Sequence, residues 1–138
     1  MHIKSYNYLP EEAIFIRKTV FMEEQGFINE FDKSDDVSIH IVLFVLNNPI
    51  ATCRLYYSDS QNCYVIGRIA TIKEYRGNKY GAEIVKYAEN EIRKRKGVFV
   101  GLSAQENAKG FYRKLGYRTY GEPYMDEGCS HIWMKKEL

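Results

Sequence analysis

The sequence predicts a mixed α/β fold, in which a mostly antiparallel sheet contains one splayed, parallel pair of strands and is flanked by helices. Three apolar runs of strand length follow one another between residues 38 and 72, separated by short polar turns, which is typical of an antiparallel meander. A helical stripe and another strand come next, so this strand–helix–strand unit implies a parallel connection. The length of 138 residues suits a single domain, residues 1–138.

The first half of the chain is expected to supply one helix and most of the sheet. Residues 2–8 alternate weakly and predict a first strand. A helix is expected from Pro10 to about Met22, because proline suits a first helical turn and apolar residues then recur at helical spacing. Residues 23–36 are acidic and irregular and predict a loop. The strands of the meander are expected at residues 38–46, 50–57 and 63–72.

The second half alternates between helices and strands. Apolar residues from Gly81 to Ile92 repeat at i, i+4, i+7 and i+11, which predicts a helix. The basic run Arg93–Lys96 occupies its last turn, and Gly97 stands where a left-handed residue usually ends a helix. The remaining elements are expected to be a strand at residues 98–104, a short helix at 105–115 ended by Gly116, and a strand at 131–135.

Composition excludes several classes of function. With 20 Lys and Arg against 18 Asp and Glu, the net charge is only +2, which argues against a dedicated nucleic-acid binder. The sequence contains no run of about 18 apolar residues, so no membrane-spanning helix is expected. Three cysteines without a C-x-x-C pair indicate free thiols in a reducing cytoplasm, and three scattered histidines give no metal-ligand spacing. The cysteines are Cys53, Cys63 and Cys129, and the histidines are His2, His40 and His131.

The first segment that suggests chemistry is Arg76-Gly77-Asn78-Lys79-Tyr80-Gly81, between a predicted strand and a predicted helix. The first N–H groups of a helix are unpaired, and the helix dipole adds positive charge there, so such a turn can bind a pyrophosphate. Gly77 and Gly81 permit close approach of the backbone, while Arg76 and Lys79 add charge. Taken alone, this turn is equally compatible with glycines that only shape the chain.

The second segment runs from Ser103 to Tyr117 and contains Asn107, Phe111 and Tyr112. Phe111, with Ala108 and Leu115, has the spacing of a buried helical stripe. Tyr112 is adjacent to Phe111 and is therefore expected to point away from the middle of that stripe, at the rim of the core. On this pattern alone, the segment needs no function beyond packing.

Together, the two segments resemble the GCN5-related N-acetyltransferases, which transfer acetyl from acetyl-CoA to amines. Arg76 and Gly81 match the family's loop pattern Gln/Arg-x-x-Gly-x-Gly/Ala, while Lys79 replaces its central glycine. The preceding strand Ile69-Ala70-Thr71 looks like the one that binds the pantetheine arm, and Asn107 and Tyr112 lie in a segment similar to the late helix motif. The start Val20-Phe21-Met22-Glu23-Glu24-Gln25 and the tail Gly128-Cys129-Ser130-His131-Ile132-Trp133-Met134 resemble a small bacterial branch.

The resemblance implies roles for individual residues. Tyr112 matches the general acid that protonates the departing CoA thiolate, and a backbone N–H of the Ile69–Thr71 strand would stabilise the oxyanion. His131 matches a histidine that serves as base in related enzymes, and imidazole titrates in a useful range. A base acting through water at Glu23 or Glu24 is the alternative. His131 could equally be a structural strand histidine, and His40 is expected at the edge of the core.

The acceptor is less well defined by the sequence. Glu23 and the acidic loop that follows would attract a cationic amine, or would simply be solvated. Arg54 and Arg68 lie on neighbouring predicted strands, where they could clamp a carboxylate or phosphonate, or pair with acids. Both features together would suit a zwitterionic, amino-acid-like molecule.

Three classes of function therefore compete. The first is an acetyl-CoA-dependent N-acetyltransferase acting on a small-molecule primary amine by direct attack, without a metal, in the cytoplasm, as a monomer or homodimer. The second is a non-catalytic acyl-CoA sensor on the same fold. The third is a nucleic-acid or partner-binding module that uses Arg93–Lys96, although this basic run is more simply explained as a solvated helix end.

Overall fold

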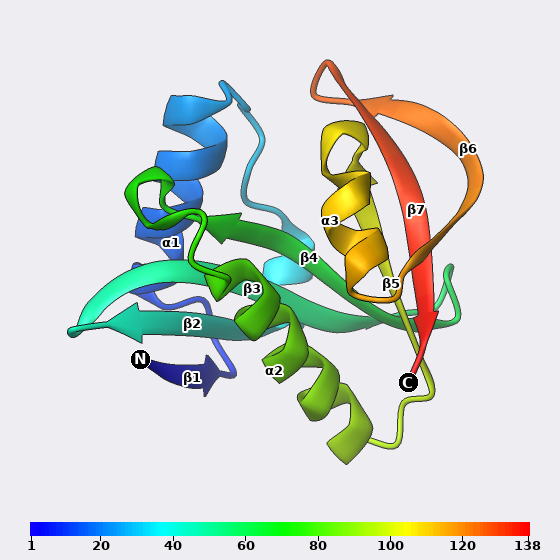
Figure 1. The fold of residues 1–138 in the computed structure, drawn as a ribbon, viewed down its shortest axis with the longest axis horizontal. Helices are drawn as coiled ribbons and strands as arrows, with labels where there is room; N and C mark the ends of the chain where they lie inside the picture. The colour runs from blue at the N-terminus through cyan, green and yellow to red at the C-terminus, as the bar shows by residue number, and fades with distance from the viewer.

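The computed structural model describes all 138 residues and contains one seven-stranded sheet with the strand order β1-β2-β3-β4-β5-β7-β6. Figure 1 shows the helices packed around this sheet, which divides into two arms toward its C-terminal strands. The strands are β1 (His2–Tyr6), β2 (Ile39–Val45), β3 (Asn48–Ser58), β4 (Cys63–Thr71), β5 (Phe99–Gln105), β6 (Arg118–Asp126) and β7 (Cys129–Glu137), and the α-helices are α1 (Glu11–Arg17), α2 (Tyr80–Lys94) and α3 (Lys109–Lys114).

The predicted meander is confirmed. Strands β1 to β4 pair antiparallel in chain order, and β4 pairs parallel with β5 after the α2 crossover. The expected first helix is α1 followed by a π-helical segment, Lys18–Glu24, so the helical chain ends two residues beyond the predicted Met22. A 3-10 turn at Lys33–Asp36 lies inside the acidic region that was expected to be irregular.

The parallel pair is short, which opens the sheet. Only Tyr64–Val100 and Val65–Gly101 are paired between β4 and β5. Beyond them, β4 carries a bulge opposite β3 between Gly67 and Ala70, where Arg68 has a left-handed φ of 51°. A bulge bends its strand and increases the twist, so β4 and β5 diverge from this point. From Ile66 to Thr71, β4 is therefore paired with β3 on one edge only, and its other edge has no neighbouring strand.

Strand β6 was not predicted from the sequence. This strand pairs antiparallel with β7, and the register shifts between Tyr120 and Tyr124. Gly121 and Pro123 interrupt any alternation there, and nearly all of the strand is exposed, so no apolar pattern marks it. Pairing with β6 explains why β7 begins two residues earlier than predicted, and pairing with β5 explains why it ends two residues later.

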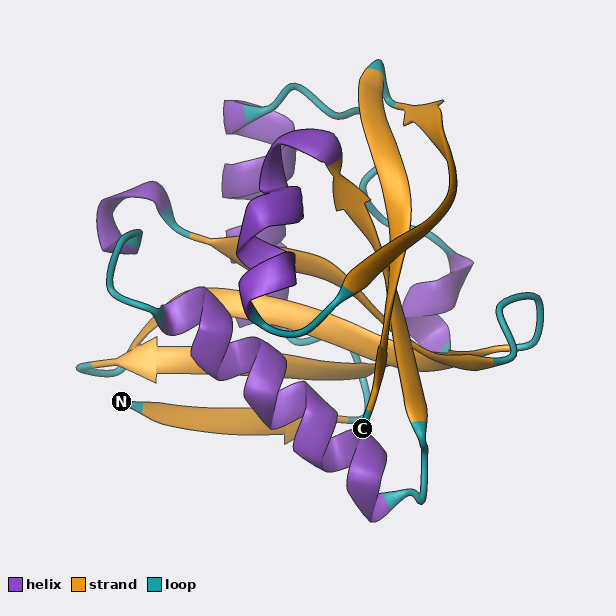
Figure 2. Cartoon of the chain, turned by 45° about the vertical axis from the view of Figure 1, so that its right-hand side comes forward, coloured by secondary structure: helices purple, strands orange, loops and turns teal.

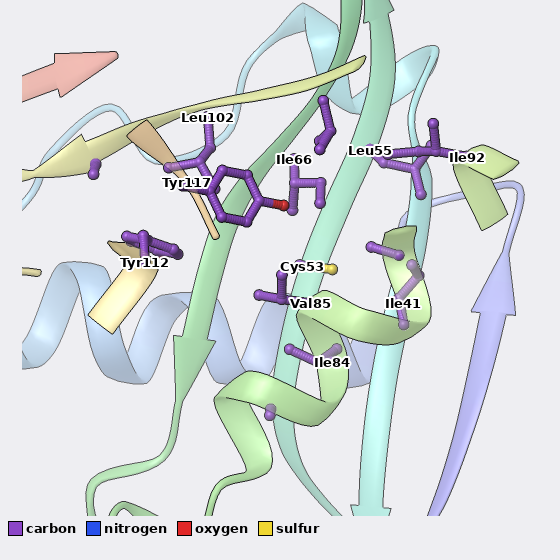
Figure 3. Close-up of a cluster of buried hydrophobic side chains, with 14 of the residues drawn as sticks. Ile41, Cys53, Leu55, Ile66, Ile84, Val85, Ile92, Leu102, Tyr112 and Tyr117 are labelled. Atoms are coloured by element: carbon purple, nitrogen blue, oxygen red, sulfur yellow. The ribbon is translucent and has the colours of Figure 1, made fainter. Parts of the chain in front are cut away.

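Two apolar clusters lie on opposite faces of the sheet. On β2, Ile41 and Leu43 belong to the larger cluster, whereas Val42 and Phe44 belong to the smaller one, as the alternation of a strand requires. Helix α2 contributes Ile84, Val85, Ala88 and Ile92 to the larger cluster, and α1 contributes Ala13 and Ile16 to the smaller one. Figure 3 shows part of the larger cluster, which includes Cys53, Tyr112 and Tyr117.

The structure corrects the expected end of α2. The left-handed residue is Lys96, with φ of 62°, and not Gly97. Gly97 is needed for a different reason: a Cβ there would lie 2.4 Å from Ile92 Cγ2 and 2.9 Å from Tyr64 Cδ2. The glycine therefore allows the chain to pass closely over the end of the helix before β5 begins.

Candidate active site

A cleft of about 1340 Å³ opens where β4 and β5 diverge. One part of it, the loop part, is lined by the chain that enters α2, and the other, the hairpin part, by the turn between β6 and β7. The sequence-predicted residues that line the cleft are Glu24, Arg68, Ile69, Ala70, Thr71, Arg76, Gly77, Lys79, Tyr80, Gly81, Asn107, Tyr112 and His131.

The loop part has the features of an anion site. Helix α2 begins after Lys79, which has a left-handed φ of 66°, and no side chain caps the first N–H groups of the helix. These donors and the positive end of the helix dipole face the cleft near the Lys79 side chain. Asn78 does not line the cleft. Its Nδ2 donates to the carbonyl of Tyr75 at 3.1 Å, so it braces the loop from within.

Hydrogen bonds to two segments of the chain restrict the Arg76 side chain. Its Nη1 and Nη2 donate to the two carboxylate oxygens of Glu24 at 2.6 and 2.7 Å, and its Nε donates to the carbonyl of Thr71 at 3.0 Å. These hydrogen bonds from Arg76 lower the pKa of Glu24. A carboxylate that is ionised and bidentately paired is a poor proton acceptor, so this geometry argues against the predicted role of Glu24 as base.

Gly81 lies where the loop meets the opposite wall. A Cβ at this position would be 3.3 Å from Phe111 Cζ and 3.8 Å from Thr71 Oγ1. Phe111 is 40% exposed and lines the cleft, contrary to the expectation that it is a core residue of α3. The absence of a side chain at Gly81 therefore keeps the passage open between the end of β4 and the Phe111 ring.

Tyr112, and not Phe111, is the buried aromatic residue of this pair, so the expectation of a rim tyrosine was wrong. Tyr112 is 8% exposed, and its ring contacts Phe111 edge to face. It makes a second edge-to-face contact with Tyr117, and Figure 3 shows both of these tyrosines in the cluster. Its hydroxyl has no hydrogen-bond partner, and the residue lines the cleft. Burial raises the pKa of Tyr112, so the phenol remains protonated at neutral pH and can donate.

His131 lies on β7 in the hairpin part. It is 7% exposed, and its ring stacks on Tyr124 with the centroids 5.9 Å apart. Nδ1 lies 2.9 Å from the carbonyl oxygen of Cys129. Because a carbonyl can only accept, Nδ1 carries the proton, and the neutral ring has its lone pair on Nε2. Nε2 has no hydrogen-bond partner within the chain and is therefore free to act as an acceptor.

Arg54 does not reach the cleft, which corrects its predicted role in binding an acceptor. It is 4% exposed and donates from Nη1 to Asp32 at 2.7 Å and to Asp35 at 2.9 Å. Arg17, which the sequence reading did not single out, binds Glu30 and Asp35, each at 2.7 Å. The complete ionic network consists of three arginines and three carboxylates: Arg17, Arg54, Arg68, Glu30, Asp32 and Asp35. Three of these network residues, Arg68, Glu30 and Asp32, line the cleft.

This network argues against the predicted role of the acidic loop in attracting a cationic amine. Its carboxylates are largely matched by arginines, so they fasten the loop to the sheet and do not present a free negative surface. Arg68 lines the cleft, but its Nε lies 3.0 Å from Glu30 Oε2 and its Nη2 lies 3.2 Å from Asp32. Glu23 is exposed and lies outside the cleft lining, against its predicted substrate role. His40 is 1% exposed, so it lies inside the core and not at its edge as predicted, and its Nε2 contacts the Asp35 carbonyl.

Residues 25–29 cross the cleft and contact its far wall. Gln25 Oε1 accepts from Gln105 Nε2 of β5 at 2.8 Å. The carboxylate of Glu127, in the β6–β7 turn, accepts from the backbone N–H of Asn29 at 3.1 Å and of Ile28 at 3.4 Å. Figure 2 shows the loop after the first helix passing close to this turn. We call residues 25–29 the strap. No local pattern in the sequence indicates contacts between residues so far apart.

No group of three or more His, Cys, Asp or Glu side chains is arranged to hold a metal ion. Among the helices, none combines the length and apolar character needed to cross a membrane.

Comparison with known proteins assigns this splayed mixed sheet to a family. Residues 11–138 match the family described as the acetyltransferase (GNAT) domain. The uncharacterized protein YyaT of Bacillus subtilis is 36% identical over 134 residues, covering 92% of this chain and 88% of its own. A crystal structure of a candidate N-acetyltransferase from Lactobacillus plantarum is 30% identical, with a TM-score of 0.89 over 99% of this chain and 97% of that one. The chain belongs to the GNAT acetyltransferase family.

The fold also occurs in a protein with coenzyme A bound. The crystal structure of an aminoglycoside 6′-N-acetyltransferase complexed with coenzyme A has a TM-score of 0.75 and 16% identity, over 99% of this chain and 97% of that one. At this identity, the likeness concerns the fold.

Proposed function

We propose that this protein transfers the acetyl group of acetyl-CoA to a primary amine of a small molecule, by direct attack of the amine on the thioester. The observation that carries the proposal is that one cleft combines an uncapped helix N-terminus, an unpaired strand edge, an unpartnered phenol and an imidazole with a free lone pair. The solved relative with coenzyme A bound supports acyl-CoA as the donor.

The loop part would hold the donor. The first N–H groups of α2 and the Lys79 ammonium would bind the pyrophosphate, since both offer positive charge at one point. The free edge of β4 at Ile69, Ala70 and Thr71 would hydrogen-bond the pantetheine arm. Asn107, at the start of the α3 segment, lines the same passage. Holding the thioester rigidly can lower the barrier by several kcal/mol.

The reaction needs proton transfers both at the acceptor nitrogen and at the CoA sulfur. An acceptor amine is mostly protonated at neutral pH, so His131 Nε2 would remove a proton and free the nitrogen lone pair. The nitrogen then forms a bond to the carbonyl carbon, while an N–H of β4 stabilises the charge on the carbonyl oxygen. As the carbon–sulfur bond breaks, the Tyr112 hydroxyl would give its proton to the CoA sulfur. The new amide nitrogen then loses its second proton, which restores the Tyr112 phenol, and His131 releases its proton to solvent. The products are an N-acetyl amine and free CoA.

The strap supports a small acceptor. Because Gln25 and Glu127 make contacts across the cleft, a polypeptide would have to displace the strap to lie over the hairpin part. A small amine needs no such movement. The engagement of Arg54 and Arg68 with carboxylates removes the main support for a zwitterionic acceptor.

The test is an assay of thiol release from acetyl-CoA with a panel of amines, amino acids, polyamines, aminoglycosides and lysine peptides, with the products identified by mass spectrometry. We expect at least one small amine to be acetylated faster than any peptide. CoA binding without transfer to any member would favour the acyl-CoA sensor instead.

A further inference from the structure

Glu24 and Arg76 join two segments that are 52 residues apart in the sequence. Glu24 is the last residue of the π-helical segment, and Arg76 lies in the loop between β4 and α2. Both side chains are partly exposed, 34% for Glu24 and 41% for Arg76, and both line the cleft. The pair is bidentate, with two nearly parallel hydrogen bonds of 2.6 and 2.7 Å, which is the geometry that restricts a guanidinium most strongly.

The guanidinium is also fixed to the end of β4. Arg76 Nε donates to the Thr71 carbonyl, so one edge of the group binds the strand while its other nitrogens bind Glu24. The hydrogen bond from the Arg76 side chain to the Thr71 carbonyl thereby closes residues 71–76 into a ring. Only the residues from Gly77 to Lys79 then separate this ring from the first turn of α2.

We infer that Glu24 is a positioning residue for the donor site: it holds Arg76 so that the loop presents its backbone N–H groups to the CoA pyrophosphate. The inference rests on the proposed function, because it requires the acyl donor to bind at this loop. Glu24 acts through Arg76 and does not itself contact the donor. No proton transfer is assigned to it.

The inference predicts an effect opposite in sign to simple electrostatics. A carboxylate near a pyrophosphate repels it, so removing the charge of a bystander should strengthen CoA binding or leave it unchanged. If Glu24 organises the loop, the loss of its charge should weaken binding, because the loop must then be ordered when CoA arrives. The sign of the change therefore separates the two roles.

Glu74 provides a matched control. It is exposed on the same loop, and its charge acts on Arg76, but it makes no hydrogen bond to that residue. Glu74→Gln removes a negative charge from the same surroundings without breaking the Glu24–Arg76 pair. We expect CoA to bind Glu74→Gln as tightly as the parent or slightly more tightly.

The experiment is isothermal titration of CoA into four proteins: the parent, Glu24→Gln, Arg76→Ala and the double variant. We expect Glu24→Gln to raise the Kd for CoA about fivefold, the upper range for an exposed ion pair. In the Arg76→Ala background, the same substitution should no longer weaken binding, because the side chain through which Glu24 acts is gone. A purely structural effect of Glu24 would persist in that background.

Two outcomes overturn the inference. One is a Glu24→Gln variant that binds CoA as tightly as the parent, and the other is an equal weakening with and without Arg76. Circular dichroism of each variant at the titration temperature establishes that it is folded. If the parent itself does not bind CoA, the proposed function fails and the inference fails with it, whereas parental binding with no effect of Glu24→Gln contradicts the inference alone.

Discussion

The imidazole of His131 donates its Nδ1 proton to the carbonyl of Cys129, two residues earlier on the same strand, over 2.9 Å. This bond sets the tautomer and holds the ring plane, because the backbone of a paired strand cannot easily move. The bond leaves Nε2 as the nitrogen that can accept a proton, which the proposed role of His131 as base requires.

His131→Asn is expected to lower kcat/KM most at neutral pH and less at high pH, where the free amine is already abundant. Removal of a general base usually costs about 10²–10⁴ in rate. The kcat/KM of the variant should therefore rise more steeply with pH than that of the parent. Kinetics over a broad pH range with the best acceptor provide the measurement, and His131→Ala separates packing from proton transfer. An unchanged profile in both variants would make His131 structural.

Tyr112→Phe is expected to lower kcat by about 10²–10⁴ while leaving the Kd for CoA nearly unchanged, because the ring and its packing remain. Burial raises the pKa of Tyr112 above the ordinary value of about 10, so the phenol stays protonated as the pH rises. The parental profile should accordingly show no descending limb from this group below pH ~10. Equal losses of binding and turnover would instead indicate that Tyr112 only supports the cleft.

Gly81→Asp is expected to abolish CoA binding, since a side chain and a negative charge would enter the passage beside Phe111 and Thr71. Gly81→Ala is the matched control. Its methyl group would meet only the ring of a partly exposed phenylalanine, which can move slightly, so binding should weaken far less. Titration calorimetry of both variants compares the two effects, and similar affinities for Asp and Ala would place the pyrophosphate elsewhere.

The ionic network of three arginines and three carboxylates predicts a specific acid sensitivity of the fold. Burial alone would raise the pKa of Asp35, but hydrogen bonds from Arg17 and Arg54, together with one from the Asp32 backbone, lower it to about 2. A carboxylate with a depressed pKa stabilises the fold above its unfolded value of about 3.9, and this contribution is lost as the pH falls toward 2.

Asp35→Asn should therefore lower stability at neutral pH by about 3 kcal/mol, the usual cost of breaking a buried ion pair. The variant should also lose less stability than the parent between pH 4 and pH 2. Urea unfolding at several pH values measures both quantities. Parallel curves for the two proteins in this interval would show that Asp35 does not carry the acid dependence.

Local patterns were sufficient for the meander, for α2 and for the parallel connection to β5, because each has a continuous periodicity. They failed where the apolar signal is weak or ambiguous. Strand β6 contains Gly121 and Pro123 and buries almost nothing. In α3, a rotation of the helix by one residue decides whether Phe111 or Tyr112 is buried. Helical spacing alone does not fix this rotation in so short a helix.

Contacts between distant segments could not be predicted at all. Glu24 was recognised as a candidate, but its partner Arg76 lies 52 residues away, and that partner changes its chemistry. Arg54 was predicted to bind an anionic group of the acceptor, because a guanidinium often does so, yet Asp32 and Asp35 already bind it. The loop and the late helix motif could be found because their residues are close together in the sequence, whereas the strap is defined only by the folded chain.

The central claim is that the cleft at the splay of β4 and β5 binds acetyl-CoA, and thermal unfolding with and without millimolar acetyl-CoA tests it most directly. A ligand at a hundredfold excess over its Kd stabilises the native state by about 2.7 kcal/mol. We predict that the Tm of the parent rises by several degrees and that the Tm of Gly81→Asp does not change. An unchanged Tm of the parent would contradict the account.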